Sequence, residues 1–282
     1  MLMRKILLTS VGVAALAVSA NATDFTLSGT AKVKIHDDGN TSVDVSTAIG
    51  VSRTFDNGMV LSLSNNNMGN AGELTIKSDA ISVTFGDFDQ NEKNPGLNGN
   101  AAAADITGDG VHSGASAARI AAGGVHSNDG AISLGATVAG VSVGAAMNNE
   151  GDTMFGGSMT TDMSGIGLTI GGDILSDNTS VYDETVIGVK ATMGALVAVV
   201  NSVQREQDAA VCTQTGSGTD CDIMNYSAAY TAGGLVLGFQ GNDNDMSSYS
   251  ATYTIVPGMQ FEIGSLDDGS NSTSSAELQM SF

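Results

Sequence analysis

The stretch DFTLSGTAKVKIH, residues 24–36, alternates between two kinds of side chain. Apolar or small residues occupy the odd positions, and polar residues, among them Lys32 and Lys34, occupy the even ones. Successive side chains of a β-strand point to opposite faces, so a period of two over this length predicts a strand whose faces meet different solvents. A helix would mix the two sets of residues.

The same alternation returns along the rest of the chain. Segments 81–85, 249–255 and 276–282 each place apolar residues on one face and Ser, Thr, Gln or Glu on the other. Gly, Asn and Asp supply the backbone angles of hairpin turns, and tight connections with such residues lie at 56–58, 79–80, 139–140, 164–165, 194, 233–234 and 257–258. Longer polar stretches alternate with them, at 37–41, 65–72, 87–130, 148–153, 176–183, 204–223, 242–247 and 267–274.

These seven turns and eight loops predict 16 strands, with all short turns at one end of the sheet. A transmembrane β-barrel has this asymmetry, with short periplasmic turns, long external loops and apolar-out, polar-in strands. Closure also removes sheet edges, which lipid cannot hydrogen-bond. We therefore predict an all-β, 16-stranded antiparallel transmembrane β-barrel over residues 23–282. Two stretches fit less well, because 73–78 is short for a spanning strand and 195–203 is apolar without alternation.

Composition excludes several other classes of protein. Charged residues make up 14% of the chain, against ~25% in soluble domains, and acids outnumber bases 30 to 10. So few bases cannot form the basic surface that a nucleic acid requires. A hydrophobic content of 41% is too high for a disordered chain. Only the N-terminus approaches the apolar run of ~20 residues that a membrane-spanning helix needs.

The N-terminus predicts export from the cytoplasm. Arg4 and Lys5 precede an apolar run over 6–18, and small residues at Ala20 and Ala22 occupy the two positions that a signal peptidase reads. We predict a signal peptide over 1–22 that is cleaved before Thr23. The alternative, a single membrane anchor, fits less well because the run is short and no stop-transfer flank follows.

Several of these features resemble the general porins of Gram-negative outer membranes, and within them the alphaproteobacterial, Rhodobacter-type group. The features are the signal peptide, a first strand that opens DFTLSG, and Phe282 at the end of an alternating last strand. The segment ISVTFGD at 81–87 is similar to the end of the fifth strand in these porins, which leads into a long third loop. The sequence departs from the family in having no Trp, only 5% aromatic residues and no evident arginine cluster.

The resemblance implies a homotrimer of barrels in the outer membrane, each with a third loop folded inward to narrow the pore. It also implies that Phe282 is the assembly signal read by the barrel assembly machinery. The matching long segment, 87–130, is rich in acids, and loops this long are usually functional or disordered. Inside a pore its carboxylates would attract cations; in a solvated external loop, the alternative, they would have no such role. The predicted constriction residues are Asp87, Asp89, Glu92, Asp105, Asp109 and Arg119.

The opposing pore wall is predicted from strand parity. A lysine that faces lipid costs ~2–4 kcal/mol near the midplane, so charges in the polar phase should face water. Those residues are Lys32, Lys34, Asp44, Glu73, Lys77, Lys190, Glu262 and Glu277. In the alternative interpretation, each of them is an ordinary polar residue of the barrel interior and has no specific role in the pore. Arg53 falls in the apolar phase near a turn, where its head group can reach the interface.

Other candidate sites carry weaker signals. Cys212 and Cys221 lie in a Gly- and Ser-rich loop of an exported chain, which predicts a disulfide and, with no histidine nearby in sequence, no metal site. The acidic pairs Asp243/Asp245 and Asp267/Asp268 could bind Ca²⁺ or bridge to lipopolysaccharide through divalent ions, although solvated acids are the simpler reading. No nucleophile motif accompanies the three histidines, so we predict no enzyme and no cofactor.

The sequence therefore predicts a general diffusion porin for small hydrophilic solutes and ions, with a preference for cations. A substrate-specific channel is the first alternative, which the scarcity of aromatic residues disfavours. A secreted or surface β-rich adhesin or structural protein is the second, and an outer-membrane hydrolase is the third.

Overall fold

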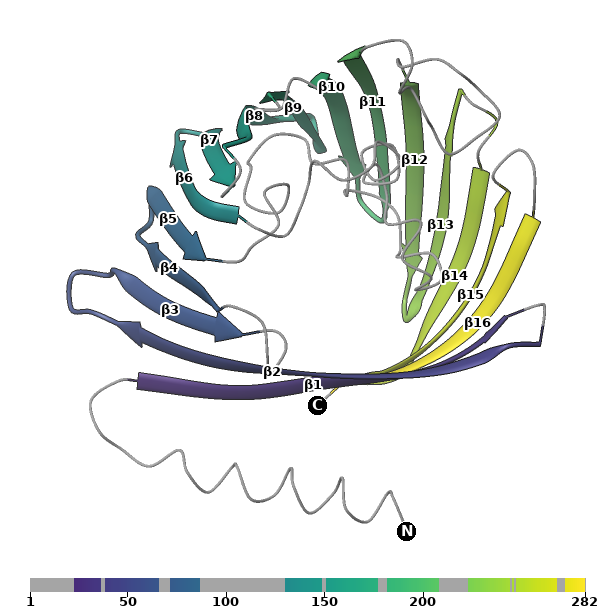
Figure 1. The fold of residues 1–282 in the computed structure, drawn as a ribbon. Coiled ribbons are helices and arrows are strands. Elements are labelled where there is room, and N and C mark those ends of the chain that lie inside the picture. Colours follow the sequence, from purple (N-terminus) through teal and green to yellow (C-terminus); the bar gives the residue numbers. More distant parts are fainter. Residues whose placement is uncertain are drawn as a thin grey trace.

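Sixteen antiparallel strands close into one barrel in the computed structural model (Figure 1). The structure describes residues 23–36, 39–65, 72–86, 130–148, 151–176, 182–207, 223–243, 245, 247–267 and 272–281. The strands are β1 (Thr23–His36), β2 (Thr41–Thr54), β3 (Val60–Asn65), β4 (Glu73–Lys77), β5 (Ile81–Gly86), β6 (Gly130–Val138), β7 (Val141–Asn148), β8 (Thr153–Met163), β9 (Ile166–Ser176), β10 (Tyr182–Met193), β11 (Leu196–Gln207), β12 (Ile223–Ala232), β13 (Leu235–Asn242), β14 (Ser247–Val256), β15 (Met259–Asp267) and β16 (Ser272–Ser281).

Each strand pairs with its neighbours in sequence, and β1 pairs with β16 to complete the ring. The predicted all-β, 16-stranded antiparallel barrel is therefore confirmed, and all seven tight turns fall between strands as expected. No helix long and apolar enough to cross a membrane occurs in the part of the chain that the structure describes.

Several strands extend into stretches that the sequence assigned to loops. β11 continues to Gln207 and β9 to Ser176, and β16 already begins at Ser272. As a result, only residues 268–271 separate β15 from β16. The predicted loop bounds at 176–183, 204–223 and 267–274 were therefore too wide, whereas the predicted connection at 37–41 matches the gap between β1 and β2. The stretches 87–129 and 208–222 remain the long connections between strands.

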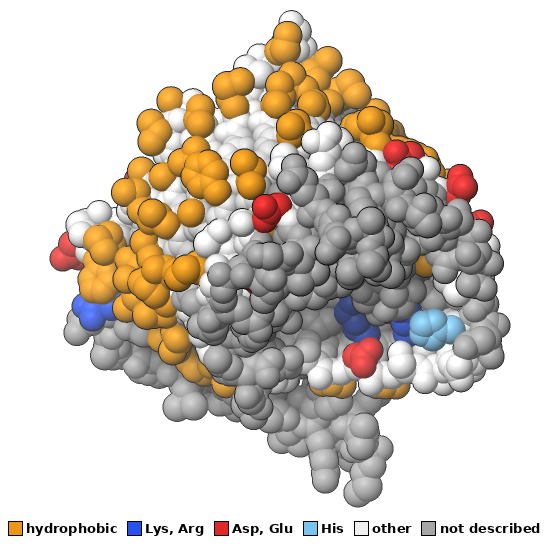
Figure 2. Space-filling view, turned by 45° about the horizontal axis from the view of Figure 1, so that its top comes forward, with side chains coloured by type: hydrophobic (Ala, Val, Ile, Leu, Met, Phe, Trp, Pro, Cys, Tyr) orange, Lys and Arg blue, Asp and Glu red, His pale blue; other side chains and the backbone are white. Residues whose placement is uncertain are grey.

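The distribution of apolar residues is the reverse of that in a soluble domain. Large hydrophobic side chains are exposed around the barrel, and Val43 and Val138 reach 68% and 67% exposure. Figure 2 shows hydrophobic side chains spread over a flank of the outer surface. A soluble monomer seldom exposes so large an apolar patch, whereas a lipid-facing barrel needs one. The polar phase of each strand consequently faces the lumen.

The two stretches that alternate poorly still form strands. β4 has only five residues. In β11, Val200 is 49% exposed on the outer face, while Val199 on the inner face is 2% exposed. The apolar run therefore reflects a strand whose inner face is locally apolar as well.

Tight turns at the short-turn end use left-handed backbone. Ala139 and Ser164 have φ angles of 51° and 59°, and each is followed by a glycine that also has a positive φ. Two consecutive positive φ angles are the geometry of the type I′ turn, whose twist matches that of a hairpin.

Close packing of β8, β9 and β10 depends on glycines without room for a side chain. A Cβ added at Gly172 would lie 2.5 Å from the carbonyl oxygen of Val186, so Gly172→Ala forces the backbones apart. We expect a loss of ~1–3 kcal/mol in the free energy of unfolding. At Gly167 on the same strand the nearest atom would be 3.7 Å away, which is an ordinary contact.

The matched variant Gly167→Ala should therefore stay within ~0.5 kcal/mol of wild type. Denaturant unfolding in detergent, followed by far-UV circular dichroism, measures both variants. An equal free energy of unfolding for the two variants would contradict the prediction, because it would mean that β9 and β10 can move apart without a loss of stability.

Candidate functional site

The predicted pore-wall residues lie on the inner face of the barrel. Lys34, Glu262 and Glu277 are the most buried, at 3%, 7% and 5% exposure. Lys32, Glu73 and Lys190 are half-buried, while Asp44 and Lys77 are exposed. Arg53 lies in the outer phase near the turn end, with its guanidinium carbon 5.1 Å from the centre of the Phe55 ring.

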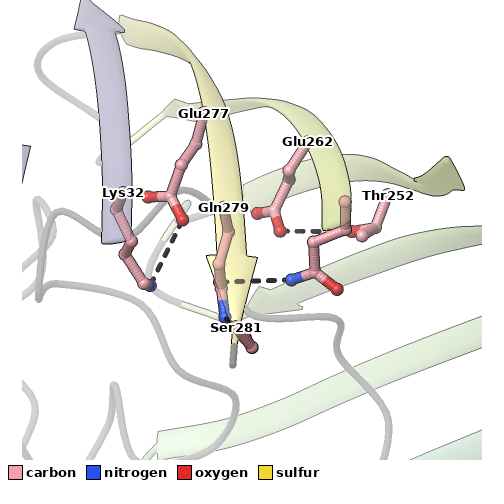
Figure 3. Close-up of polar contacts among 7 residues, drawn as sticks. Lys32, Thr252, Glu262, Glu277, Gln279 and Ser281 are labelled. Carbon is pink, nitrogen blue, oxygen red and sulfur yellow. Dashed lines mark hydrogen bonds and ion pairs between the residues drawn. The ribbon is translucent and has the colours of Figure 1, made fainter. Parts of the chain in front are cut away.

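A charged cluster lies where the barrel closes, on β1, β15 and β16 (Figure 3). Lys32 Nζ is 3.2 Å from Glu277 Oε1, and Lys34 stands opposite Glu277 in register. Glu277 is in turn directly opposite Glu262. Like charges opposite each other repel, and the two lysines offset that repulsion. The closure of the ring thus brings together charges from the two ends of the chain.

Hydroxyl and amide groups extend this cluster across the inner wall. Thr252 Oγ1 donates a hydrogen bond to Glu262 Oε2 at 3.2 Å, and Gln260 Nε2 donates to Gln279 Oε1 at 3.2 Å (Figure 3). Further around the ring, Asn225 Nδ2 donates to Asn201 Oδ1 at 2.9 Å. This part of the wall is polar and largely held by side-chain hydrogen bonds.

Acidic side chains also line β8 and β9. Asp152 and Asp173 are each 3% exposed. Asp152 Oδ2 accepts a hydrogen bond from Asn148 Nδ2 at 2.7 Å, and the Asp152 amide donates to Asn148 Oδ1 at 2.8 Å. Neither acid was predicted from the sequence as a residue of the pore wall. The alternation of β8 and β9 would have found Asp173, since it lies in register with the inward Gly156.

An apolar patch on the inner wall was also missed. Met154, Leu175, Val186 and Val199 occupy inward positions of β8 to β11 and are each 1–2% exposed. The inner wall from β8 to β11 is thus mixed, with these apolar side chains beside Asp173 and Lys190, whereas the inner wall from β12 to β1 is mainly polar. Apolar residues on both faces weaken the alternation, so the pattern alone could not assign them.

Aromatic side chains of the outer face lie at two levels. Phe25, Phe55, Tyr230 and Tyr253 are exposed toward the turn end. A second group, Tyr226, Phe239 and Tyr249, lies closer to the loop end, with ring centroids 5.8 Å and 5.1 Å apart. Aromatic girdles at both interfaces are typical of membrane barrels.

Other predicted site residues fall outside the described residues. They are the constriction residues Asp87, Asp89, Glu92, Asp105, Asp109 and Arg119, the cysteines Cys212 and Cys221, and the terminal Phe282. Within the part of the chain that is described, no group of three or more His, Cys, Asp or Glu side chains could hold a metal ion.

Comparison with solved structures identifies the architecture. A porin structure refined at 1.8 Å resolution superposes with a TM-score of 0.63 at 17% sequence identity, and a triple mutant of the Rhodopseudomonas blastica porin with 0.58 at 13%. Each alignment covers 92% of this chain and 100% of the other. No family model and no curated protein sequence matches the chain. The chain therefore has the porin fold.

Proposed function

We propose that this chain is a general diffusion porin of a bacterial outer membrane, which passes small hydrophilic solutes and ions passively. The observation that carries the proposal is the two-sided wall: apolar side chains cover the outside of a closed ring, and charged and hydrogen-bonding side chains line the inside. Hydrocarbon can contact the first set while water fills the space lined by the second. Passage through such a pore needs neither a reaction nor an energy source.

The proposal includes a preference for cations. Among the side chains that the structure describes, inward acids outnumber inward lysines: Asp44, Glu73, Asp152, Asp162, Asp173, Glu262 and Glu277 stand against Lys32, Lys34, Lys77 and Lys190. A narrow passage with low-dielectric walls focuses this field and enriches cations. The acids of 87–129, if they face the pore, would add to the effect.

We also propose how the chain is exported, assembled and placed in the cell. A signal peptide over 1–22, the alphaproteobacterial Rhodobacter-type group, recognition of Phe282 by the barrel assembly machinery and a Cys212–Cys221 disulfide come from the sequence. A homotrimer is supported by the small outward residues Gly29 and Ala31, which allow close contact between barrels. Asp243, Asp245 and Asp267 lie at the loop ends of β13 to β15, where Ca²⁺ could bridge them to lipopolysaccharide.

The proposal predicts ion conductance with a defined sign of selectivity. The full mature chain, extracted in detergent and added to a planar bilayer, should give stepwise conductance, in groups of three for a trimer. In a KCl gradient the reversal potential should show K⁺ to be more permeant than Cl⁻. A surface adhesin would give no conductance. Anion selectivity would contradict only the proposed preference for cations and would leave the proposed channel function standing.

A further inference from the structure

Every inward residue of β14 carries a hydroxyl group. The four residues are Ser248, Ser250, Thr252 and Thr254, and the first two are 1% and 7% exposed. Thr252 is bonded to Glu262, whereas the Oγ atoms of Ser248 and Ser250 have no hydrogen-bond partner in the part of the chain that the structure describes. Buried polar groups almost always have partners. Within the described residues, these two hydroxyls therefore keep hydrogen-bonding capacity for a further polar group.

A third such hydroxyl lies on β16 at the same level. Gly264 on β15 stands opposite Ser250 on one side and opposite Ser275 on the other. The Oγ of Ser275 is likewise buried without a partner among the described residues. The two serines are about 10 Å apart across two strand spacings. Gly264 is partly exposed and has no side chain, so a small molecule over it could reach both hydroxyls.

The residues beside Gly264 determine which chemistry fits. On its own strand, Glu262 supplies carboxylate oxygens toward the turn side, and Leu266 supplies an apolar, 9% exposed side chain toward the loop side. Hydroxyls both donate and accept hydrogen bonds, and carboxylates accept them. This set matches a neutral molecule that carries several hydroxyls on a C–H framework. A charged solute would compete with the existing ion pair of Lys32 and Glu277.

We propose that the Gly264 site, formed by Ser250, Gly264 and Ser275 with Glu262 and Leu266 at its ends, binds small neutral polyhydroxylated solutes during passage. The inference rests on the proposed function, since solutes reach this wall through the lumen. Binding would be weak and would slow polyols relative to solutes of equal size without hydroxyls.

Mannitol in planar bilayers tests the site. It should reduce the KCl conductance of the full chain saturably, beyond its effect on bulk conductivity, while triethylene glycol dimethyl ether, a solute of similar size without hydroxyls, should not. In Ser250→Ala/Ser275→Ala the half-saturating mannitol concentration should rise about fivefold or more, since each lost net hydrogen bond corresponds to a factor of roughly 2–12. If the double variant does not insert, Ser250→Ala and Ser275→Ala alone should each raise it about twofold or more.

The matched control removes hydroxyls that already have partners. Thr160 and Thr169 bond to each other on the inner wall at 3.0 Å, so Thr160→Val/Thr169→Val should leave mannitol binding unchanged. Conductance without saturable mannitol block, or block that survives loss of both serines, would overturn this inference and leave the porin proposal standing. Absence of any conductance in the wild-type chain would overturn both.

Discussion

Exchanging Val189 and Lys190 on β10 should prevent the barrel from inserting into a bilayer. Val189 faces outward and is 41% exposed, whereas Lys190 faces the lumen between Thr169 and Val199. The double variant Val189→Lys/Lys190→Val keeps composition and net charge and moves one ammonium group from water to hydrocarbon. That transfer costs ~2–4 kcal/mol near the midplane. Folding into liposomes, followed by far-UV circular dichroism and protease protection, should show a large loss of inserted protein.

A single variant separates this effect from the loss of Lys190 itself. Lys190→Val removes the same lumen charge but places nothing charged in lipid, so its stability should stay within ~0.5 kcal/mol of wild type. If the exchanged chain inserts as well as Lys190→Val does, the two faces of β10 do not meet different solvents. The porin proposal would then lose its physical basis.

Strand periodicity was sufficient to predict the barrel because one face of its strands is apolar and exposed while the opposite face is mainly polar. Wherever one face meets hydrocarbon and the other water, side chains must alternate, as Phe25, Leu27, Val33 and Ile35 do against Lys32 and Lys34. The glycine-containing turns added the order of the hairpins. Together they determined strand number, topology and the face on which each wall charge lies.

The ends of the strands could not be predicted in the same way. Beyond the hydrocarbon both faces meet water, so the selection for alternation disappears. Gln204 on the outer face of β11, and Ser272 and Thr273 on the two faces at the start of β16, are polar and were assigned to loops. Backbone hydrogen bonds to the neighbouring strands extend these strands regardless of side-chain polarity.

Contacts within the candidate site depend on register, which sequence pattern does not contain. Lys34 stands opposite Glu277 only because β1 joins β16 with one particular offset, and Glu277 stands opposite Glu262 because of the register between β15 and β16. Parity predicted that all three side chains face inward. It could not predict that they form one cluster with Lys32 instead of standing as separate charges in water.

Neutralising five acids of the long 87–129 segment should lower the cation preference. In the variant Asp87→Asn, Asp89→Asn, Glu92→Gln, Asp105→Asn and Asp109→Asn, the K⁺/Cl⁻ permeability ratio should fall by about threefold or more, because charge in a narrow passage changes local ion concentrations by an order of magnitude or more. Reversal potentials in a KCl gradient measure the ratio.

Two further variants locate the charges that act on ions. Asp243→Asn/Asp245→Asn/Asp267→Asn removes acids at the loop ends of β13 to β15, where solvent and salt screen them, and should change the ratio little. Glu262→Gln/Glu277→Gln removes two inward carboxylates beside Lys32 and Lys34 and should shift the ratio toward anions. If this wall variant abolishes the cation preference while the five-acid variant of residues 87–109 keeps it, selectivity resides in the wall at the barrel closure. The predicted constriction loop would then have no part in selectivity.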